Sequence, residues 1–161
     1  MKIHLIRHAK TTPLTQSTHD FDRKLLPKGI VQANVLGSYL HNKEIKPELT
    51  WCSSAIRTKE TFIILQHSLE LGKTTFLDDL YLCDRELFLK KIWELKNGKD
   101  LLIIGHNDGI SQLATYLTDE MLSMRTSEYY CIEFASKTWN EISFGTGTII
   151  DHFHPSVYLL D

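Results

Sequence analysis

The strongest constraint on the fold is a continuous apolar run, Leu101-Leu102-Ile103-Ile104-Gly105, which leads directly into His106. A strand with one face in water alternates apolar and polar side chains, and this run does not alternate. An unbroken apolar strand is typical of a parallel sheet that helices cover on both faces. The run therefore predicts a central strand of an α/β protein that ends at a polar turn.

The rest of the chain up to residue 117 alternates short apolar segments with amphipathic ones. We expect strands at 2–7, 49–52 and 75–77, and a loop over 11–23. Expected helices begin near Pro27, at Ser53 or Ser54, and at about 84, with a fourth following residue 109. This alternation predicts a three-layer α/β/α sandwich with a mostly parallel central sheet.

The periodicity also predicts which side chains are buried. The first helix is expected to bury Ile30, Ala33, Leu36 and Leu40, and the second to bury Ile56, Phe62, Leu65 and Leu69 before stopping at Gly72. The third helix is expected to run to about 95. After residue 129 the pattern becomes strand-like and predicts a hairpin of 129–134 with 139–144, with a further strand at 148–153.

Length and composition predict one domain over residues 1–161. The formal net charge of −2 and the pI of about 6.4 argue against a nucleic-acid partner. No apolar run approaches the roughly 18 residues that cross a bilayer, and the N-terminus has no signal-peptide core, so we expect no membrane contact and a cytoplasmic protein. The three cysteines are far apart and suggest neither disulfides nor a metal site. We expect no metal and no cofactor.

Polar side chains follow three of the predicted strands. Arg7 and His8 close the first strand, Arg57 lies in the first turn after the 49–52 strand, and His106 follows the 101–105 strand. Ligands of open α/β sheets bind outside the carboxyl ends of parallel strands. We therefore expect two histidines and two arginines to meet in one crevice.

Such a set suits a phosphoryl group. The guanidinium groups of Arg7 and Arg57 can donate forked hydrogen bonds to phosphate oxygens, and a protonated His106 would add another donor. His8 is then the candidate nucleophile, a neutral imidazole that attacks phosphorus and becomes a phosphohistidine. Its other ring nitrogen needs an acceptor such as a backbone carbonyl, and the surrounding cations would keep it neutral.

Three motifs together carry a family resemblance. They are Leu5-Ile6-Arg7-His8-Ala9-Lys10, Ser53-Ser54-Ala55-Ile56-Arg57-Thr58-Lys59-Glu60-Thr61 and Ile104-Gly105-His106-Asn107. They resemble the histidine phosphatase superfamily, also called phosphoglycerate mutase-like. The small size and the Asp22-Arg23-Lys24-Leu25-Leu26-Pro27-Lys28-Gly29 segment are most similar to SixA-type phosphohistidine phosphatases.

The resemblance implies a metal-free α/β/α phosphatase in which His8 is phosphorylated and Arg7, Arg57 and His106 bind the phosphoryl group. Arg23 matches a position that lies near the phosphate in SixA-like proteins. Asn107 is also included among the expected substrate-binding residues.

The sequence marks no general acid. Asp78, Asp79, Asp84 and Glu86 lie in the interval where mutase relatives carry a catalytic Glu, without a local motif, and Asp108 could donate a proton or cap the next helix. An alkoxide leaving group needs a proton, whereas the imidazole of phosphohistidine leaves more readily. The expected substrate is therefore phosphohistidine in a phosphoprotein. The alternatives are a phosphomonoesterase or mutase-like enzyme on small metabolites, and a phosphate- or phosphopeptide-binding module without turnover.

Overall fold

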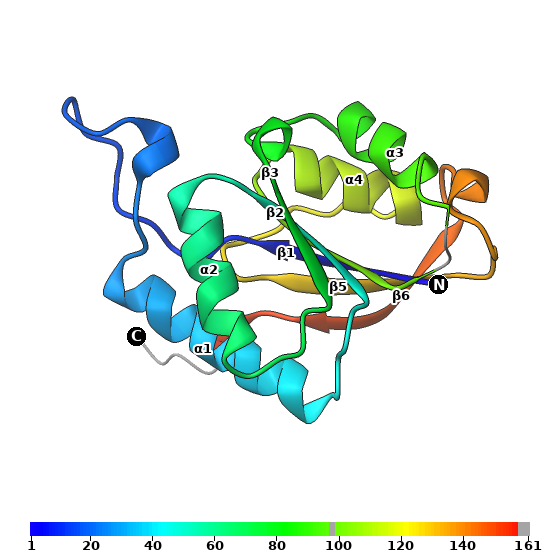
Figure 1. Ribbon diagram of the computed structural model, residues 1–161, viewed down its shortest axis with the longest axis horizontal. Helices are drawn as coiled ribbons and strands as arrows, with labels where there is room; N and C mark the ends of the chain where they lie inside the picture. Colours follow the sequence, from blue (N-terminus) through cyan, green and yellow to red (C-terminus); the bar gives the residue numbers. More distant parts are fainter. Residues whose placement is uncertain (97–98, 158–161) are drawn as a thin grey trace.

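The structure, a computed structural model, describes residues 1–96 and 99–157 and contains a six-stranded sheet with helices on both faces (Figure 1). The strands are β1 (Lys2–Arg7), β2 (Leu49–Ser53), β3 (Lys73–Leu77), β4 (Leu101–Gly105), β5 (Tyr129–Phe134) and β6 (Gly147–Phe153). The α-helices are α1 (Pro27–Asn42), α2 (Ile56–Gln66), α3 (Arg85–Trp93) and α4 (Gly109–Thr118). The expected single domain includes residues 97–98 and 158–161, which lie outside the described residues.

The sheet has the order β3-β2-β4-β1-β5-β6. Strands β3, β2, β4 and β1 run parallel, and β5 and β6 are antiparallel to their neighbours. The apolar strand β4 lies at the centre, between β1 and β2, and all five of its residues are buried. Because β1, β2 and β4 are parallel, their carboxyl ends meet at one edge of the sheet.

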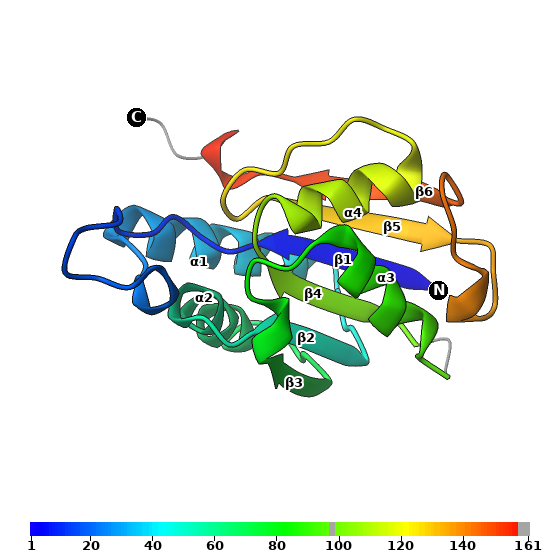
Figure 2. The ribbon, with the colours of Figure 1, turned by 90° about the horizontal axis from the view of Figure 1, so that it is seen from above.

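The helices form two layers, α1 and α2 on one face of the sheet and α3 and α4 on the other, as Figures 1 and 2 show from two directions. Two large apolar clusters fill the space between the layers. Phe88, Ile92 and Leu113 pack against Ile103 on the α3 and α4 side. Leu36, Leu65 and other apolar side chains pack against Ile104 on the opposite side. The predicted α/β/α sandwich is thus confirmed.

The predicted hairpin was wrong in its second strand. Strand β5 pairs with β6, and residues Trp139–Glu141 form a 3-10 helix. The side chains of Trp139 and Ile142 are both buried in the core, 0% and 1% exposed. Their spacing of three residues matches a turn of 3-10 helix rather than the two-residue period of a strand.

Two helix predictions also need correction. Ile30 is 46% exposed, because the buried stripe of α1 passes through Gly29 instead. A Cβ at Gly29 would lie 2.0 Å from the backbone oxygen of Lys10, so only glycine allows α1 to approach this loop. Helix α2 begins at Ile56 rather than at Ser53 or Ser54, and it ends at Gln66, well before Gly72.

Candidate active site

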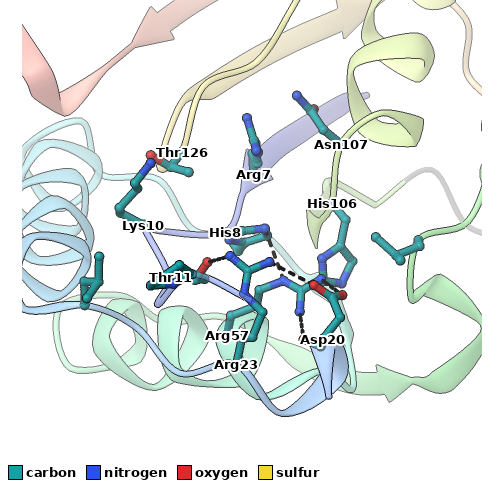
Figure 3. A pocket seen from close by; sticks show the side chains of 13 residues that line it. Arg7, His8, Lys10, Thr11, Asp20, Arg23, Arg57, His106, Asn107 and Thr126 are labelled. Carbon is teal, nitrogen blue, oxygen red and sulfur yellow. Dashed lines mark hydrogen bonds and ion pairs between the residues drawn. The ribbon is translucent and has the colours of Figure 1, made fainter. Parts of the chain in front are cut away.

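The carboxyl ends of β1, β2 and β4 border a cavity of about 420 Å³ (Figure 3). It is lined by Arg7, His8, Lys10, Thr11, Pro13, Asp20, Arg23, Leu26, Arg57, Leu82, His106, Asn107 and Thr126. All six residues expected from the sequence to act on or bind the substrate are in this set: Arg7, His8, Arg23, Arg57, His106 and Asn107. The parallel strands therefore bring together segments that are separated by up to a hundred residues of chain.

His8 is held in one orientation just beyond β1. Its backbone N–H donates to the carbonyl of Gly105 at 3.1 Å, which fixes the turn against β4. Its Nδ1 lies 2.8 Å from the carbonyl oxygen of Ala9, so Nδ1 carries the proton and donates, as expected from the sequence. Arg57 donates from Nε to Nε2 of His8 at 3.3 Å. Nε2 therefore keeps its lone pair and faces a cation.

The environment of His8 also keeps the ring neutral. Burial lowers the pKa of His8 to about 3, and the charges of Arg57, Arg7 and Arg23 act in the same direction, against the raising effect of the Ala9 carbonyl. The side chain is 7% exposed. A neutral ring with its Nε2 lone pair toward the cavity is the state that a nucleophile requires.

Arg57 is anchored by Asp20, a residue that sequence analysis did not select. The Arg57 guanidinium donates from Nη1 to the backbone oxygen of Asp20 and from Nη2 to its carboxylate at 3.0 Å. Arg23 donates to the other carboxylate oxygen at 2.8 Å, and the hydroxyl of Tyr81 donates to Oδ2 at 2.6 Å. Dashed lines in Figure 3 join this carboxylate to both arginines. The anchoring leaves Nε of Arg57 directed at His8.

Asp20 is ionised in this network. Burial pushes the pKa of Asp20 upward, but the hydrogen bonds from Tyr81 and Arg23 and the charge of Arg57 outweigh it and hold the pKa well below its usual range. Asp20 lies in a short 3-10 helix (Asp20–Asp22) inside the segment expected to be a loop. No local pattern marks it, because its partners come from residues 23, 57 and 81 and only the folded chain brings them together.

Arg23 uses its donors within the protein. In addition to Asp20, it donates from Nε to the backbone oxygen of Thr12 at 2.7 Å and from Nη2 to the hydroxyl of Thr11 at 2.6 Å. The side chain thus lines the cavity while it ties the 11–12 segment to the short helix at Asp20.

His106 follows β4 and approaches His8, with ring centroids 5.3 Å apart. Its Nε2 lies 2.8 Å from the hydroxyl of Ser53, the last residue of β2, and its Nδ1 is buried without a hydrogen-bond partner among the described residues. Burial lowers the pKa of His106 to about 2, with the neighbouring His8 and Arg57 acting in the same direction. The ring of His106 is therefore neutral, because burial and nearby cations oppose a further charge, and it can donate through a ring N–H rather than as a cation.

Arg7 and Asn107 share one acceptor. Arg7 donates from Nη1 to the backbone oxygen of Met124 at 2.8 Å, and the side-chain amide of Asn107 donates to the same oxygen at 2.9 Å. The amide oxygen of Asn107 accepts from Ser111 at 2.6 Å. Both polar ends of Asn107 are thus used inside the protein, whereas Nε of Arg7 is buried without a partner among the described residues. Such an unpaired donor favours an anion as the occupant of the site.

None of the carboxylates considered as general acids lines the cavity. These residues are Asp78, Asp79, Asp84, Glu86 and Asp108. Asp79 pairs with Lys91 at 2.6 Å, and Asp84 caps α3 by accepting from the backbone N–H of Leu87. Asp108 is exposed before α4 and makes no capping hydrogen bond through its side chain. Among the described residues that line the cavity, Asp20 is the only carboxylate.

The described residues contain no group of three or more His, Cys, Asp or Glu side chains arranged to hold a metal ion. Nor does any helix in residues 1–96 or 99–157 combine the length and the apolar character needed to cross a membrane.

Comparison with known proteins agrees with this geometry. The sequence profile of the histidine phosphatase superfamily (branch 1) matches residues 3–84, slightly more than half of the 161 residues. An uncharacterized protein of Mycobacterium leprae is 32% identical over 117 residues, which cover 70% of this chain and 71% of that protein.

Two solved structures have nearly the same fold over almost their whole length. The protein histidine phosphatase SixA, complexed with tungstate, has a TM-score of 0.83 at 22% identity and covers 99% of this chain and 100% of its own. A candidate phosphohistidine phosphatase SixA from Agrobacterium tumefaciens has the same TM-score at 21% identity, covering 96% and 97%.

The parallel strand ends, the two buried histidines and the clustered arginines define an α/β protein with a pocket rich in basic side chains. The sequence match makes the class specific. This chain belongs to the histidine phosphatase superfamily, branch 1, and that membership supports a phosphatase activity.

Proposed function

We propose that the chain is a phosphohistidine phosphatase that acts on a phosphoprotein and uses His8 as its nucleophile. The lone pair of Nε2 attacks phosphorus, the new P–N bond forms, and the P–N bond to the substrate imidazole breaks. The electron pair of the broken bond goes to the departing imidazole. When the other nitrogen of that ring carries a proton, the leaving group is neutral and needs no proton from the protein.

Water completes the cycle. Its oxygen attacks the phosphorus bound to His8, the P–Nε2 bond breaks, and its electron pair returns to Nε2. The proton on Nδ1 stays with the ring throughout, held by the carbonyl oxygen of Ala9 at 2.8 Å. The water protons pass to the phosphate product and to solvent. His8 thus returns to the neutral state from which it attacked.

The other cavity residues would bind and stabilise the phosphoryl group. Nε of Arg57 points at Nε2 of His8, so a phosphoryl group on Nε2 would lie next to this donor. Nε of Arg7 and Nδ1 of His106 are buried and unpaired among the described residues, so each can donate to an oxygen of the bound group. Donors that are fixed before the reaction stabilise the charge of the transition state without reorganising.

One observation carries the choice of substrate. Asp20, the only carboxylate among the described residues lining the cavity, is ionised and bonded to Arg57, Arg23 and Tyr81. It accepts hydrogen bonds and has no proton to give to an alkoxide. A leaving group that departs without a general acid suits this cavity better, and phosphohistidine provides one. The fold likeness to SixA proteins supports the same choice.

The test is to incubate the purified protein with a phosphohistidine peptide and, separately, with an aryl phosphate and a sugar phosphate, and to measure phosphate release. We expect the highest kcat/KM for the peptide. Turnover of the aryl or sugar phosphate alone would contradict the assignment to phosphohistidine. Retained phosphate binding without turnover of any substrate would instead indicate a recognition module.

A further inference from the structure

A second hollow, of about 380 Å³, adjoins the cavity at His8. The two share three lining residues: Arg7, Lys10 and Thr126. The rest of its lining comes from α1 and from the segments around 125 and 155: Lys28, Gln32, Arg125, His154 and Ser156. In Figure 3, Lys10 and Thr126 are seen on one side of His8 and Asp20 on the other. The hollow is therefore an extension of the site and not a separate feature of the surface.

The hollow is cationic although the chain has a formal net charge of −2. Four of its lining residues are basic: Arg7, Lys10, Lys28 and Arg125. No Asp or Glu is among the described residues that line it. A nearby carboxylate is that of Glu128, which is buried and lies 3.4 Å from Nε of Arg125 and 2.7 Å from Nε2 of His152. Within the described part of the chain, the basic side chains that line the hollow outnumber this buried acid, and a local excess of positive charge attracts anions.

The walls of the hollow are held by internal hydrogen bonds. The side chain of Gln32, 5% exposed, accepts from the backbone N–H of Lys10 at 3.0 Å. Glu128 accepts from the backbone N–H of Arg125 at 2.5 Å. His154 is 6% exposed, burial lowers its pKa, and Ser156 lies 2.5 Å from its Nδ1. The basic side chains thus project from backbone that is fixed in place, which lowers the ordering cost of binding.

We propose that this hollow binds a second anionic group of the substrate, namely an Asp or Glu side chain next to the phosphohistidine in the chain of the target protein. The proposal rests on the proposed function. A phosphoryl group at His8 would lie beyond the shared wall of Arg7 and Lys10, so a neighbouring residue of the same peptide can enter the hollow. The carboxylate would then pair with Lys28 and Arg125, the two basic residues that line only the hollow.

The test compares two phosphohistidine peptides of equal length, one with Glu on both sides of the phosphohistidine and one with Gln. For the wild-type protein we expect a kcat/KM about five- to tenfold higher for the Glu peptide, the effect of two partly exposed ion pairs. The double variant Lys28→Gln, Arg125→Gln should lose this preference and retain its activity on the Gln peptide. The matched control is Lys73→Gln, an exposed lysine on edge strand β3, which removes charge far from the hollow and should keep the preference.

Equal kcat/KM for the two peptides in the wild type, or a preference that survives in the double variant, would overturn the proposal. An equal loss in Lys73→Gln would also overturn it, because the preference would then come from the overall charge. Faster turnover of a small bisphosphate than of either peptide, lost in the double variant, would identify the second group as a phosphate and overturn the peptide assignment.

A binding measurement separates this proposal from the proposed function. The His8→Asn variant is titrated with Glu and Gln peptides that carry a non-hydrolysable phosphohistidine analogue. Tighter binding of the Glu peptide, with no turnover of phosphohistidine by the wild type, would uphold the second anion site and reject the phosphatase function. Turnover of phosphohistidine by the wild type, with equal binding of the two peptides by His8→Asn, would uphold the phosphatase function and reject the second anion site.

Discussion

The hydroxyl of Ser53 lies 2.8 Å from Nε2 of His106 and links the last residue of β2 to the residue after β4. The backbone N–H of Ala55 donates to the same hydroxyl oxygen at 3.4 Å. We expect the hydroxyl proton to be donated to Nε2, which places the ring proton of His106 on Nδ1. Because Nδ1 is buried and unpaired among the described residues, Ser53 fixes the tautomer that directs an N–H donor into the cavity.

Removing this hydroxyl should weaken the binding of the transition state. We expect Ser53→Ala to lower kcat/KM on a phosphohistidine peptide by about five- to tenfold, the loss of one oriented hydrogen bond. Ser53→Thr should recover most of the activity. Nitrogen NMR of His106 should show Nδ1–H in the wild type and a mixture of tautomers in Ser53→Ala.

The matched control is Ser54→Ala, which makes the same chemical change one residue along, outside the residues that line the cavity. Equal losses in the two variants would mean that the segment matters only for folding.

Asp20 should act as a positioning residue for Arg57. Asp20→Ala removes the carboxylate that accepts hydrogen bonds from Arg57 and Arg23. The guanidinium of Arg57 is then no longer held with its Nε toward Nε2 of His8. We expect kcat/KM to fall by about ten- to a hundredfold, as for the loss of hydrogen bonds between charged groups. Tyr81→Phe, which removes one neutral donor to the same carboxylate, should cost less.

Asp22→Ala provides the control for Asp20→Ala, since Asp22 is an exposed aspartate of the same short helix. Its activity should stay near that of the wild type. If Asp20→Ala kept full activity, the anchoring of Arg57 would not contribute to the reaction.

The lowered pKa of His8 predicts a loss of stability in acid. The folded-state pKa of about 3 lies below the usual 6.5, so between these values the unfolded chain binds a proton that the folded protein excludes. Stability should then fall as the pH falls from 6.5 toward 3, by up to about 1.4 kcal/mol per pH unit for this group.

Urea unfolding of wild type and His8→Asn at a series of pH values isolates this contribution. Because asparagine does not titrate, the variant should lose less stability than the wild type over this range. Parallel losses in the two proteins would contradict the buried, neutral state of His8.

The fold was predictable because its pattern is repeated along the chain. The unbroken apolar run of β4 and the alternating helices and strands point to a parallel sheet covered on both faces, and the structure has this arrangement. The segment after residue 134 was harder to predict. Trp139 and Ile142 are apolar in a strand-like context, and only their burial against the core selects a 3-10 turn.

The site also contains residues that the sequence predicts and one that it does not. Arg7, His8, Arg57 and His106 could be placed together because each follows or closes a predicted strand. Asp20 could not be predicted as a site residue, because its role depends on Arg57 and Tyr81, which are 37 and 61 residues away along the chain. Asn107 lines the cavity as expected, but the sequence does not reveal that Met124 and Ser111 occupy both ends of its amide.

The role of His8 as the nucleophile is tested most directly by trapping the phosphorylated protein. Wild-type protein is mixed with excess phosphohistidine peptide, quenched with base within the first turnover, and digested for mass spectrometry. We expect one acid-labile, base-stable phosphoryl group on His8 that chases into inorganic phosphate, and no phosphoryl group in His8→Asn. A phosphoryl group on another residue, or full turnover by His8→Asn, would contradict it.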